Sequence, residues 1–227
     1  MRKESCTAVV VAAGSASRMR GIDKTVASIG GIPMILRTVQ ALSQSDRIDE
    51  IVVVTRQDLI ETICTLCKDV AKFRTAVVGG KSRTESVLSG ITDANGTLVA
   101  IHDGARPFVT QDVIDRAIEA AEQHGAAAPA IAVKDTIKVA RDSRICHTPD
   151  RSELFAVQTP QVFYKTEILN ALQTALAQNL NLTDDCSAFE AMGKTVILTE
   201  GSDENIKITT PIDLAFGEAI LKRRDAL

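Results

Sequence analysis

The chain has 227 residues, of which 45% are hydrophobic and 24% charged, and its formal net charge is −3. This length suits one α/β domain with a single core, and the lack of a global positive field argues against a nucleic-acid partner. No apolar run approaches the roughly 20 residues that span a bilayer, and the first residues lead directly into a core strand without a signal-peptide pattern, so we expect a cytoplasmic protein with no membrane partner.

Apolar runs alternate with segments of helical period, which is the pattern of βαβ units in a mostly parallel sheet. The runs predict strands near residues 7–12, 50–54, 74–78, 97–102, 127–132 and 195–199. Helices are expected between them, one opened by Pro33, one capped by Ser82 with Glu85, and two capped by Thr110 and Thr210. The expected fold is an α/β, Rossmann-like, mostly parallel twisted sheet flanked by helices, in one domain over residues 1–227.

The first strand ends in a loop of small residues that carries three cations. Residues 8–20 read Ala-Val-Val-Val-Ala-Ala-Gly-Ser-Ala-Ser-Arg-Met-Arg, and Lys24 follows. An uninterrupted β-branched run is typical of a parallel strand covered on both faces, and such sheets bind ligands at the carboxyl ends of their strands. Small side chains let backbone N–H groups face an anion, while Arg18 and Lys24 supply charge. The loop predicts a polyphosphate site, although an ordinary turn with its cations in water fits the segment equally well.

Three further stretches after strands carry more polar groups than a turn needs. Residues 79–86 place two glycines before a capped helix, where a flat ligand can approach the backbone. Asp103 follows the strand near 97–102, a position where an acid commonly binds a ribose hydroxyl or a phosphate-held metal. Lys207 lies between the last strand and the last helix. The alternatives are a plain turn for residues 79–86, a helix cap for Asp103 and a solvated side chain for Lys207.

The five cysteines are scattered and odd in number, which predicts reduced thiols. Cys64 and Cys67 form a C-x-x-C pair, but residues 58–69 have a helical pattern on which the two are simply neighbours one turn apart. No group of residues has the spacing of a protein-built metal centre.

Residues 134–162 break the alternation of strands and helices. Two β-type pieces, 136–139 and 155–157, flank a polar tip at 141–144. We expect an inserted β-arm that projects from the sheet and packs its apolar side chains against a second copy of the chain, while an excursion folded back on its own domain is the alternative. The cations and hydroxyls of the arm could bind an anion, or could only keep an exposed edge soluble.

Taken in order, these pieces resemble the 2-C-methyl-D-erythritol 4-phosphate cytidylyltransferases of isoprenoid biosynthesis. The resemblance runs from about Thr7 to Leu221 and rests on the motifs AAG-x-x-x-RM, GG-x-x-R-x-x-S, HD-x-ARP, DT-x-K, H-T-x-x-R, TPQ-x-F and NIK-x-T. It implies a nucleotidyltransferase that moves CMP from CTP to the polyol phosphate, releases pyrophosphate and forms a homodimer through the arm. Mg²⁺ is the implied cofactor, held mainly by the triphosphate, with Asp103 as the one candidate protein ligand.

The resemblance also implies the site residues. Arg18, Lys24 and Lys207 would be catalytic. The CTP-binding set would be Ala12, Ala13, Gly14, Ser15, Arg18, Lys24, Gly80, Arg83, Ser86, Asp103 and Ala105. The acceptor-binding set would be Asp103, Arg106, Thr136, Arg151, Thr159 and Lys207, with Thr136 and Arg151 reaching in from the neighbouring subunit.

Two positions depart from the family pattern. Lys24 is followed by Thr25-Val26-Ala27 where the family usually has Gln, an aromatic residue and Leu, and Lys81 stands where some relatives have an acid. Base recognition would therefore have to use backbone groups. A phosphate monoester acceptor, with a second pKa of about 6, is largely dianionic at neutral pH and needs no general base, so positioning and charge neutralisation remain for the protein.

Three other functions fit parts of the pattern. A ribitol 5-phosphate cytidylyltransferase would differ only in the polyol, and the DT-x-K and H-T-x-x-R pieces favour methylerythritol phosphate over it. A non-catalytic nucleotide-binding module would lose the cations Arg18, Lys24 and Lys207, which are all present here. A dinucleotide-dependent oxidoreductase would need G-x-G-x-x-G in the first loop and an acid after the second strand, where this chain has Thr55-Arg56.

Overall fold

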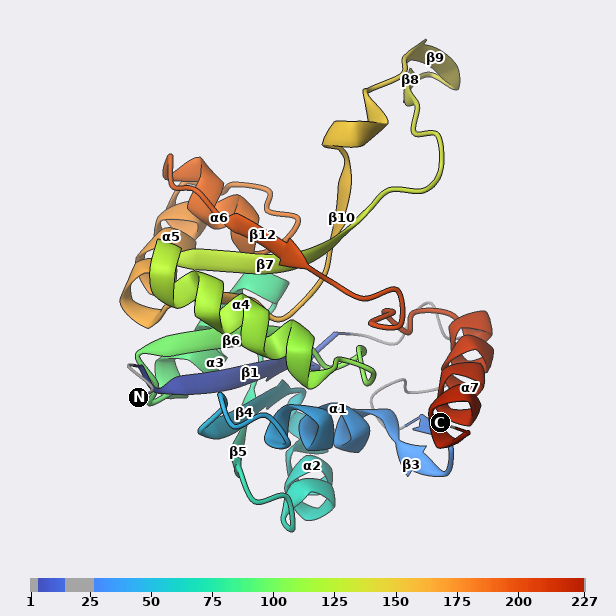
Figure 1. Cartoon of the computed structure of the whole chain (residues 1–227). Helices are drawn as coiled ribbons and strands as arrows, with labels where there is room; N and C mark the ends of the chain where they lie inside the picture. Colours follow the sequence, from blue (N-terminus) through green and yellow to red (C-terminus); the bar gives the residue numbers. More distant parts are fainter. Residues whose placement is uncertain (1–3, 15–26, 227) are drawn as a thin grey trace.

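A mixed, mostly parallel sheet of eight strands forms the centre of the molecule (Figure 1). The computed structural model describes residues 4–14 and 27–226. The strands of this sheet are β1 (Cys6–Val11), β4 (Glu50–Thr55), β5 (Phe73–Val78), β6 (Leu98–Asp103), β7 (Ala126–Ala132), β10 (Phe155–Val157), β11 (Gln161–Tyr164) and β12 (Ile197–Glu200). Their order is β10-β7-β11-β6-β1-β4-β5, with β12 paired to β7. β1, β4, β5 and β6 are parallel, whereas β11 runs antiparallel to β6 and β7.

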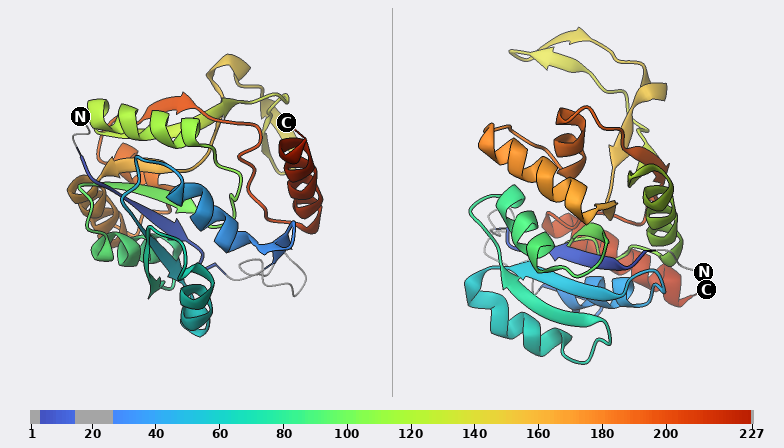
Figure 2. Two further views of the ribbon diagram at one scale, coloured as in Figure 1. Left: turned by 60° about the horizontal axis from the view of Figure 1, so that its bottom comes forward. Right: turned by 90° about the vertical axis from the view of Figure 1, so that its left-hand side faces the viewer.

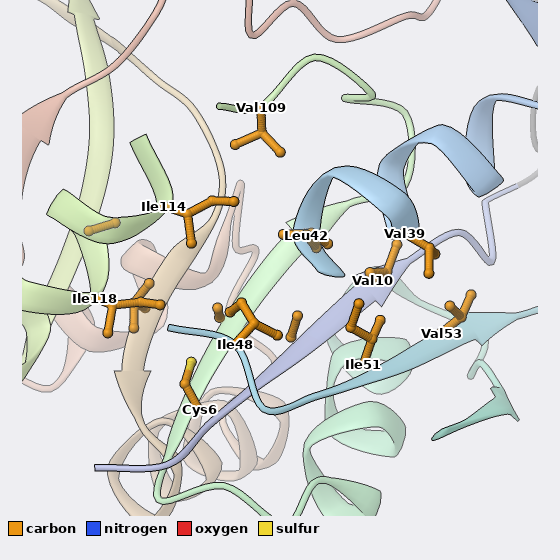
Figure 3. Packing of buried hydrophobic residues seen from close by; sticks show 14 of the residues in the cluster. Cys6, Val10, Val39, Leu42, Ile48, Ile51, Val53, Val109, Ile114 and Ile118 are labelled. Carbon is orange, nitrogen blue, oxygen red and sulfur yellow. The ribbon is translucent and has the colours of Figure 1, made fainter. Parts of the chain in front are cut away.

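Helices cover both faces of the sheet, as Figures 1 and 2 show. α1 (Met34–Ser43), α2 (Ile60–Cys67) and α4 (Gln111–His124) bury one core cluster, and α3 (Arg83–Asp93), α5 (Lys165–Ala177) and α6 (Asp185–Ala191) bury another. Successive side chains of β1 alternate between them, because Ala8 and Val10 belong to the first cluster and Val9 to the second. Figure 3 shows Val10 packed among side chains of the first cluster. The apolar run in β1 is therefore buried on both faces, as predicted.

A third, smaller core lies under α7 (Pro211–Asp225) and the hairpin of β2 (Ser28–Ile29) with β3 (Ile32–Pro33). Arg224 on α7 donates to the Glu204 carboxylate at 2.9 Å and to the Phe108 carbonyl at 2.8 Å. Glu218 accepts the N–H of Gly30, a glycine with φ 55°, at 2.7 Å. The last helix thus holds the loop that follows β6, directly after Asp103, and the loop that follows β12, which carries Lys207.

The six predicted strands are all present, with ends within two residues of the expected ones. Ser82 and Glu85 form the predicted capping box of α3. Thr110 and Thr210 occupy the N-cap positions of α4 and α7, as predicted. The Thr110 side chain makes no cap hydrogen bond, whereas Thr210 forms a capping box with Asp213, whose carboxylate accepts the Thr210 N–H at 2.8 Å. Cys64 and Cys67 lie on α2, and all five cysteines are free thiols.

The arm leaves the sheet after β7 and is seen at the top of Figure 1. It ends in a hairpin of β8 (Val139–Arg141) and β9 (Arg144–His147), with the positive φ values of 47° and 61° at Asp142 and Ser143 making the turn at the predicted polar tip. Every residue from 134 to 148 is exposed. Of the described helices, none is both long and apolar enough to cross a bilayer.

The second expected piece of the arm lies elsewhere. Residues 155–157 form β10, which pairs antiparallel with Ala130–Ala132 of β7, and the predicted continuation to 162 is β11 of the main sheet. The physical reason is that β7 extends beyond its pairing with β11, so its backbone N–H and C=O groups need a partner along that edge. The projecting part therefore ends near residue 154.

Candidate functional site

A pocket of about 490 Å³ opens at the carboxyl ends of β1 and β6. Its walls come from the end of β1, the turn before α3, the turn after β6 and the loop before α7. The lining residues are Val11, Ala12, Ala13, Gly14, Met34, Gly80, Lys81, Ser82, Arg83, Ser86, Asp103, Gly104, Ala105 and Lys207. The structure thus brings the predicted CTP-binding residues together, except Ser15, Arg18 and Lys24, which lie outside the described residues.

Asp103 is the charged centre of this pocket. Its Oδ2 atom lies 2.9 Å from Lys207 Nζ and 3.2 Å from Arg106 Nε. Burial by itself would raise the pKa of Asp103, but the charges of Lys207 and Arg106 outweigh it and lower the pKa to about 2. At neutral pH the cluster holds two cations and one carboxylate, so it carries one net positive charge toward a ligand.

Two loops far apart in sequence are fastened together to place these cations. Arg106 Nη1 donates to the Asn205 carbonyl at 2.7 Å, and the Ile208 N–H donates to the Ala105 carbonyl at 2.8 Å. Asn205, which is fully buried, donates from its side-chain amide to the Thr159 carbonyl at 2.9 Å. These contacts hold the Lys207 loop against the turn after β6.

Behind Asp103 lies a closed chain of hydrogen bonds through His102 and Thr159. The Asp103 N–H donates to Thr159 Oγ1 at 3.1 Å, and Thr159 Oγ1 lies 3.0 Å from His102 Nδ1. His102 Nε2 is 3.1 Å from the Arg106 carbonyl, so we assign the ring proton to Nε2. Full burial lowers the pKa of His102 to about 4, so the ring is neutral at pH 7.

These hydrogen bonds bear on the predicted role of Thr159. Its hydroxyl accepts from Asp103 and donates to His102, and its side chain is buried and is not among the pocket-lining residues. The structure therefore gives Thr159 the task of orienting Asp103, and its contact with an acceptor molecule stays a prediction.

The turn before α3 forms the opposite wall. Gly79 packs closely on Ala13, directly after β1. A Cβ atom added at Gly79 would lie 2.5 Å from the Cβ of Ala13, so this position requires glycine. The buried Ser86 hydroxyl accepts the Gly80 N–H at 3.1 Å and donates to the Ser82 carbonyl at 2.9 Å. Arg83 is paired with the buried Asp185, and Lys81 is exposed. Gly80 and Ser86 thus hold the shape of the wall.

The predicted acceptor-binding residues fall into two groups. Asp103 and Lys207 line the pocket, and Arg106 and Thr159 contact Asp103 without lining it. Thr136 and Arg151 lie on the exposed arm and are not among the pocket-lining residues. Arg151 Nη1 donates to the Lys134 carbonyl at 3.0 Å. A single chain does not bring the two groups together in the part that the structure describes.

Protein ligands for a metal are sparse here. Over residues 4–14 and 27–226, no three His, Cys, Asp or Glu side chains converge as a metal site would require. Asp103 is the one acid among the described residues that line the pocket, and its Oδ2 atom already faces Lys207 and Arg106. A divalent cation would fit only if a ligand such as a triphosphate supplied most of its oxygen atoms.

Two residues that hold the site together were missed by the sequence analysis. Asn205 links the Lys207 loop to Thr159, and Asp185 pairs with Arg83 across 102 residues of sequence. Asp185 gave no signal of this role in the sequence, because an acid in the first turn of a helix is already favoured by the helix dipole.

Comparisons with known proteins agree on one family. The family model described as 2-C-methyl-D-erythritol 4-phosphate cytidylyltransferase matches residues 6–223. A protein of that name from Caldanaerobacter subterraneus subsp. tengcongensis is 44% identical over 96% of this chain and 99% of its own length, and one from Clostridium botulinum is 42% identical over 95% and 96%.

Solved structures give the same answer for the fold. A 4-diphosphocytidyl-2C-methyl-D-erythritol synthase from Anaerococcus prevotii superposes with a TM-score of 0.87 at 30% identity and covers 96% of each chain. The 2-C-methyl-D-erythritol 4-phosphate cytidylyltransferase of Thermus thermophilus gives a TM-score of 0.79 at 28% identity, over 94% of this chain and 98% of that one.

Proposed function

This chain belongs to the 2-C-methyl-D-erythritol 4-phosphate cytidylyltransferase family, and we propose that the pocket between β1, α3 and the Lys207 loop is where its reaction takes place. The enzyme transfers CMP from CTP to 2-C-methyl-D-erythritol 4-phosphate, forming 4-diphosphocytidyl-2-C-methyl-D-erythritol and pyrophosphate on the non-mevalonate route to isoprenoid precursors. The observation that carries the assignment of the site is the Asp103, Arg106 and Lys207 cluster, whose net positive charge faces the same pocket as the α3 turn.

The chemistry needs cations more than it needs a base. The acceptor phosphate, largely dianionic at neutral pH because its second pKa is about 6, can attack the α-phosphorus of CTP in line while pyrophosphate leaves. Two anionic substrates repel each other, so the protein must neutralise charge while it aligns them. Lys207, with 41% of its side chain exposed and three N–H donors, can keep its contact to Asp103 and still donate to a phosphate. Arg106 supplies fixed charge behind it.

The nucleotide would lie along the wall made by Ala12, Ala13, Gly14 and the turn at residues 79–86. Gly79 of that turn packs closely on Ala13. Gly80, Asp103 and Ala105 line the pocket, and we place the flat ring of the base beside Gly80 and the ribose beside Asp103 and Ala105. Arg18 and Lys24, with Ser15, are assigned to the triphosphate. These three lie outside the described residues, so their assignment rests on the motif that opens the sequence.

Mg²⁺ is the proposed cofactor. When bound to the triphosphate it would spread negative charge away from the reacting α-phosphorus. Asp103 is the one described pocket residue that could add a carboxylate oxygen to its coordination. Turnover should stop after removal of divalent cations with EDTA and return when Mg²⁺ is added. Full activity in excess EDTA would contradict this proposal.

A homodimer would complete the site. The arm exposes apolar side chains that a monomer leaves in water, among them Ile145 at 66% and Ile137 at 41%. A second copy that covers them would bring its Thr136 and Arg151 to the acceptor phosphate. Sedimentation should give twice the monomer mass, and a fully active monomer would contradict this proposal. The cytoplasm is the proposed location, which the free thiols of all five cysteines fit.

Pyrophosphate release tests the function directly. We expect release with CTP and 2-C-methyl-D-erythritol 4-phosphate, and little with ATP, GTP or UTP. Ribitol 5-phosphate serves as the competing acceptor. Turnover that is as fast with ribitol 5-phosphate would move the assignment to that polyol, and CTP binding without any pyrophosphate release would identify a binding module.

A further inference from the structure

Arg83 and Asp185 form an end-on pair at the edge of the pocket. Arg83 Nη1 lies 2.8 Å from Asp185 Oδ1, and Nη2 lies 2.7 Å from Oδ2. The Asp185 side chain is only 1% exposed, while the Arg83 side chain is 34% exposed and lines the pocket. A guanidinium has five N–H groups, so this pairing engages two and leaves three that the described part of the chain does not bond.

The position of Asp185 is fixed by the sheet and not by Arg83. On β11, the Gln161 side-chain oxygen accepts the N–H groups of Asp185 and Cys186, both at 3.1 Å. The Gln161 amide donates to Asp184 at 2.8 Å, and Asp184 caps α6 through the Ser187 N–H at 3.0 Å. Because a buried carboxylate without a partner is costly, an Asp185 anchored in this way holds the guanidinium of Arg83 in one place.

The wall around Arg83 has few other donors to offer. Gly79 donates its N–H to the Thr55 carbonyl, Gly80 donates to Ser86, and Lys81 and Ser82 donate to the Glu85 carboxylate. All four consecutive amides of the turn are thus used inside the protein. Besides the exposed ammonium of Lys81, which no contact in the described part of the chain fixes in place, the free N–H groups of Arg83 are the charged side-chain donors among the residues of this wall that line the pocket.

Charge decides which part of a ligand they suit. The Arg83 and Asp185 pair is neutral overall, and Asp184 beside it is acidic, whereas the cluster of Asp103, Arg106 and Lys207 carries net positive charge. A phosphate gains more from the positive cluster. A neutral, fixed donor suits an uncharged oxygen, such as a base carbonyl or a ribose oxygen.

We propose that Asp185 is a positioning residue for nucleotide recognition, which holds Arg83 so that its free N–H groups donate to an uncharged oxygen in the nucleoside half of CTP. The inference rests on the proposed function, because it takes the pocket to be the CTP site. It adds a residue from α6, which does not line the pocket, to the determinants of CTP affinity.

The test compares the binding of CTP and of CMP by titration calorimetry. For Asp185→Asn we expect Kd for both nucleotides to rise about 10-fold or more, as fits the loss of a fixed charged hydrogen-bond donor. In steady-state kinetics KM for CTP should rise by a similar factor, while kcat and KM for the polyol phosphate stay within about threefold of wild type. The matched control is Glu167→Gln, which breaks the 2.9 Å pair with Lys194 beside the same helices but away from the pocket.

A second variant separates positioning from stability. Arg83→Met combined with Asp185→Leu replaces the pair by apolar side chains, a change that often preserves stability. We expect this double variant to melt near the wild-type temperature and still to bind CTP and CMP about 10-fold or more weakly. Wild-type affinity in the folded double variant would overturn the proposal, as would a loss confined to CTP, which would point to a phosphate contact. Failure of the proposed function would be seen separately, as wild-type protein that releases no pyrophosphate.

Discussion

The pocket and the arm carry the same kinds of side chains but hold them differently. At the pocket, Arg106 bonds to Asp103 and to Asn205, which lies 99 residues away in sequence, and its side chain is 12% exposed. On the arm, the Arg151 side chain bonds to the Lys134 carbonyl, 17 residues away, and both residues are exposed. The described pocket residues thus come from one chain and hold one another in place, whereas the arm has few contacts of its own, so we expect its conformation to depend on what it packs against.

The largest effect should come from Lys207 at the pocket. Lys207→Ala removes the cation nearest to the proposed acceptor phosphate, and kcat/KM should fall by about 10²–10³. Steady-state pyrophosphate release measures it. Lys134→Ala is the matched control, since Lys134 is paired to Asp203 at 2.7 Å with 74% of its side chain exposed. A loss under about threefold for Lys207→Ala would place the reaction elsewhere.

The next effect is a pH dependence of stability that belongs to the pocket. The pKa of His102 is lowered by burial to about 4 in the folded chain, whereas an unfolded histidine titrates near 6.5. Between these values the unfolded state binds the proton and the folded state does not, so the free energy of unfolding falls as pH drops from about 6.5 to 4, by as much as about 3 kcal/mol. The pKa of Asp103 is lowered to about 2 in the folded chain, so its contribution to the free energy of unfolding is lost at lower pH, as pH falls from about 4 toward 2.

Urea unfolding between pH 7 and 4.5 measures this effect. His102→Gln should lower stability at pH 7 but flatten the profile. His147→Gln on the arm is the matched control and should leave the wild-type slope. An unchanged slope in His102→Gln would show that other groups cause the loss.

Arg151 tests whether the arm serves a second subunit. Arg151→Ala should raise KM for the polyol phosphate and lower kcat/KM about 10- to 100-fold, as fits the loss of a charged hydrogen bond to phosphate. Mixed with Lys207→Ala and allowed to exchange subunits, the two variants should recover up to about a quarter of wild-type activity, because one of the two sites in a C2 heterodimer then has both residues intact. Confirmed heterodimers without any recovery would show that the sites are not shared.

The smallest effect compares two threonines. Thr159→Val leaves the Asp103 N–H and His102 Nδ1 without partners, and should lower the free energy of unfolding by about 1–3 kcal/mol. Thr148→Val on the arm removes only an exposed bond to Lys138 of 2.7 Å and should change it by less than about 0.5 kcal/mol. Urea titration of both variants checks the difference. Equal effects would contradict the contrast between pocket and arm.

The features predicted best are those that local pattern decides. The alternation of apolar runs with helical periods located all six predicted strands, because a strand buried on both faces must be apolar throughout. Ser82 and Glu85 were recognisable as a capping box because the motif is complete within four residues. Thr110 and Thr210 were placed correctly at the N-caps of α4 and α7, but the sequence did not show that the Thr110 side chain makes no cap hydrogen bond, because a cap position does not determine which oxygen accepts.

The sequence by itself determined that Asp103 and Lys207 follow strands of one sheet, and so lie at a common edge with residues 12–14 and 79–86. Only the tertiary structure decided what each side chain does there. It turned Thr159 inward to His102, paired Arg83 with Asp185, and placed residues 155–157 on β7 instead of the arm. The physical reason is that strand and helix periods are set by neighbours in sequence, whereas a buried polar group takes its partner from whichever distant segment the packing brings within about 3 Å.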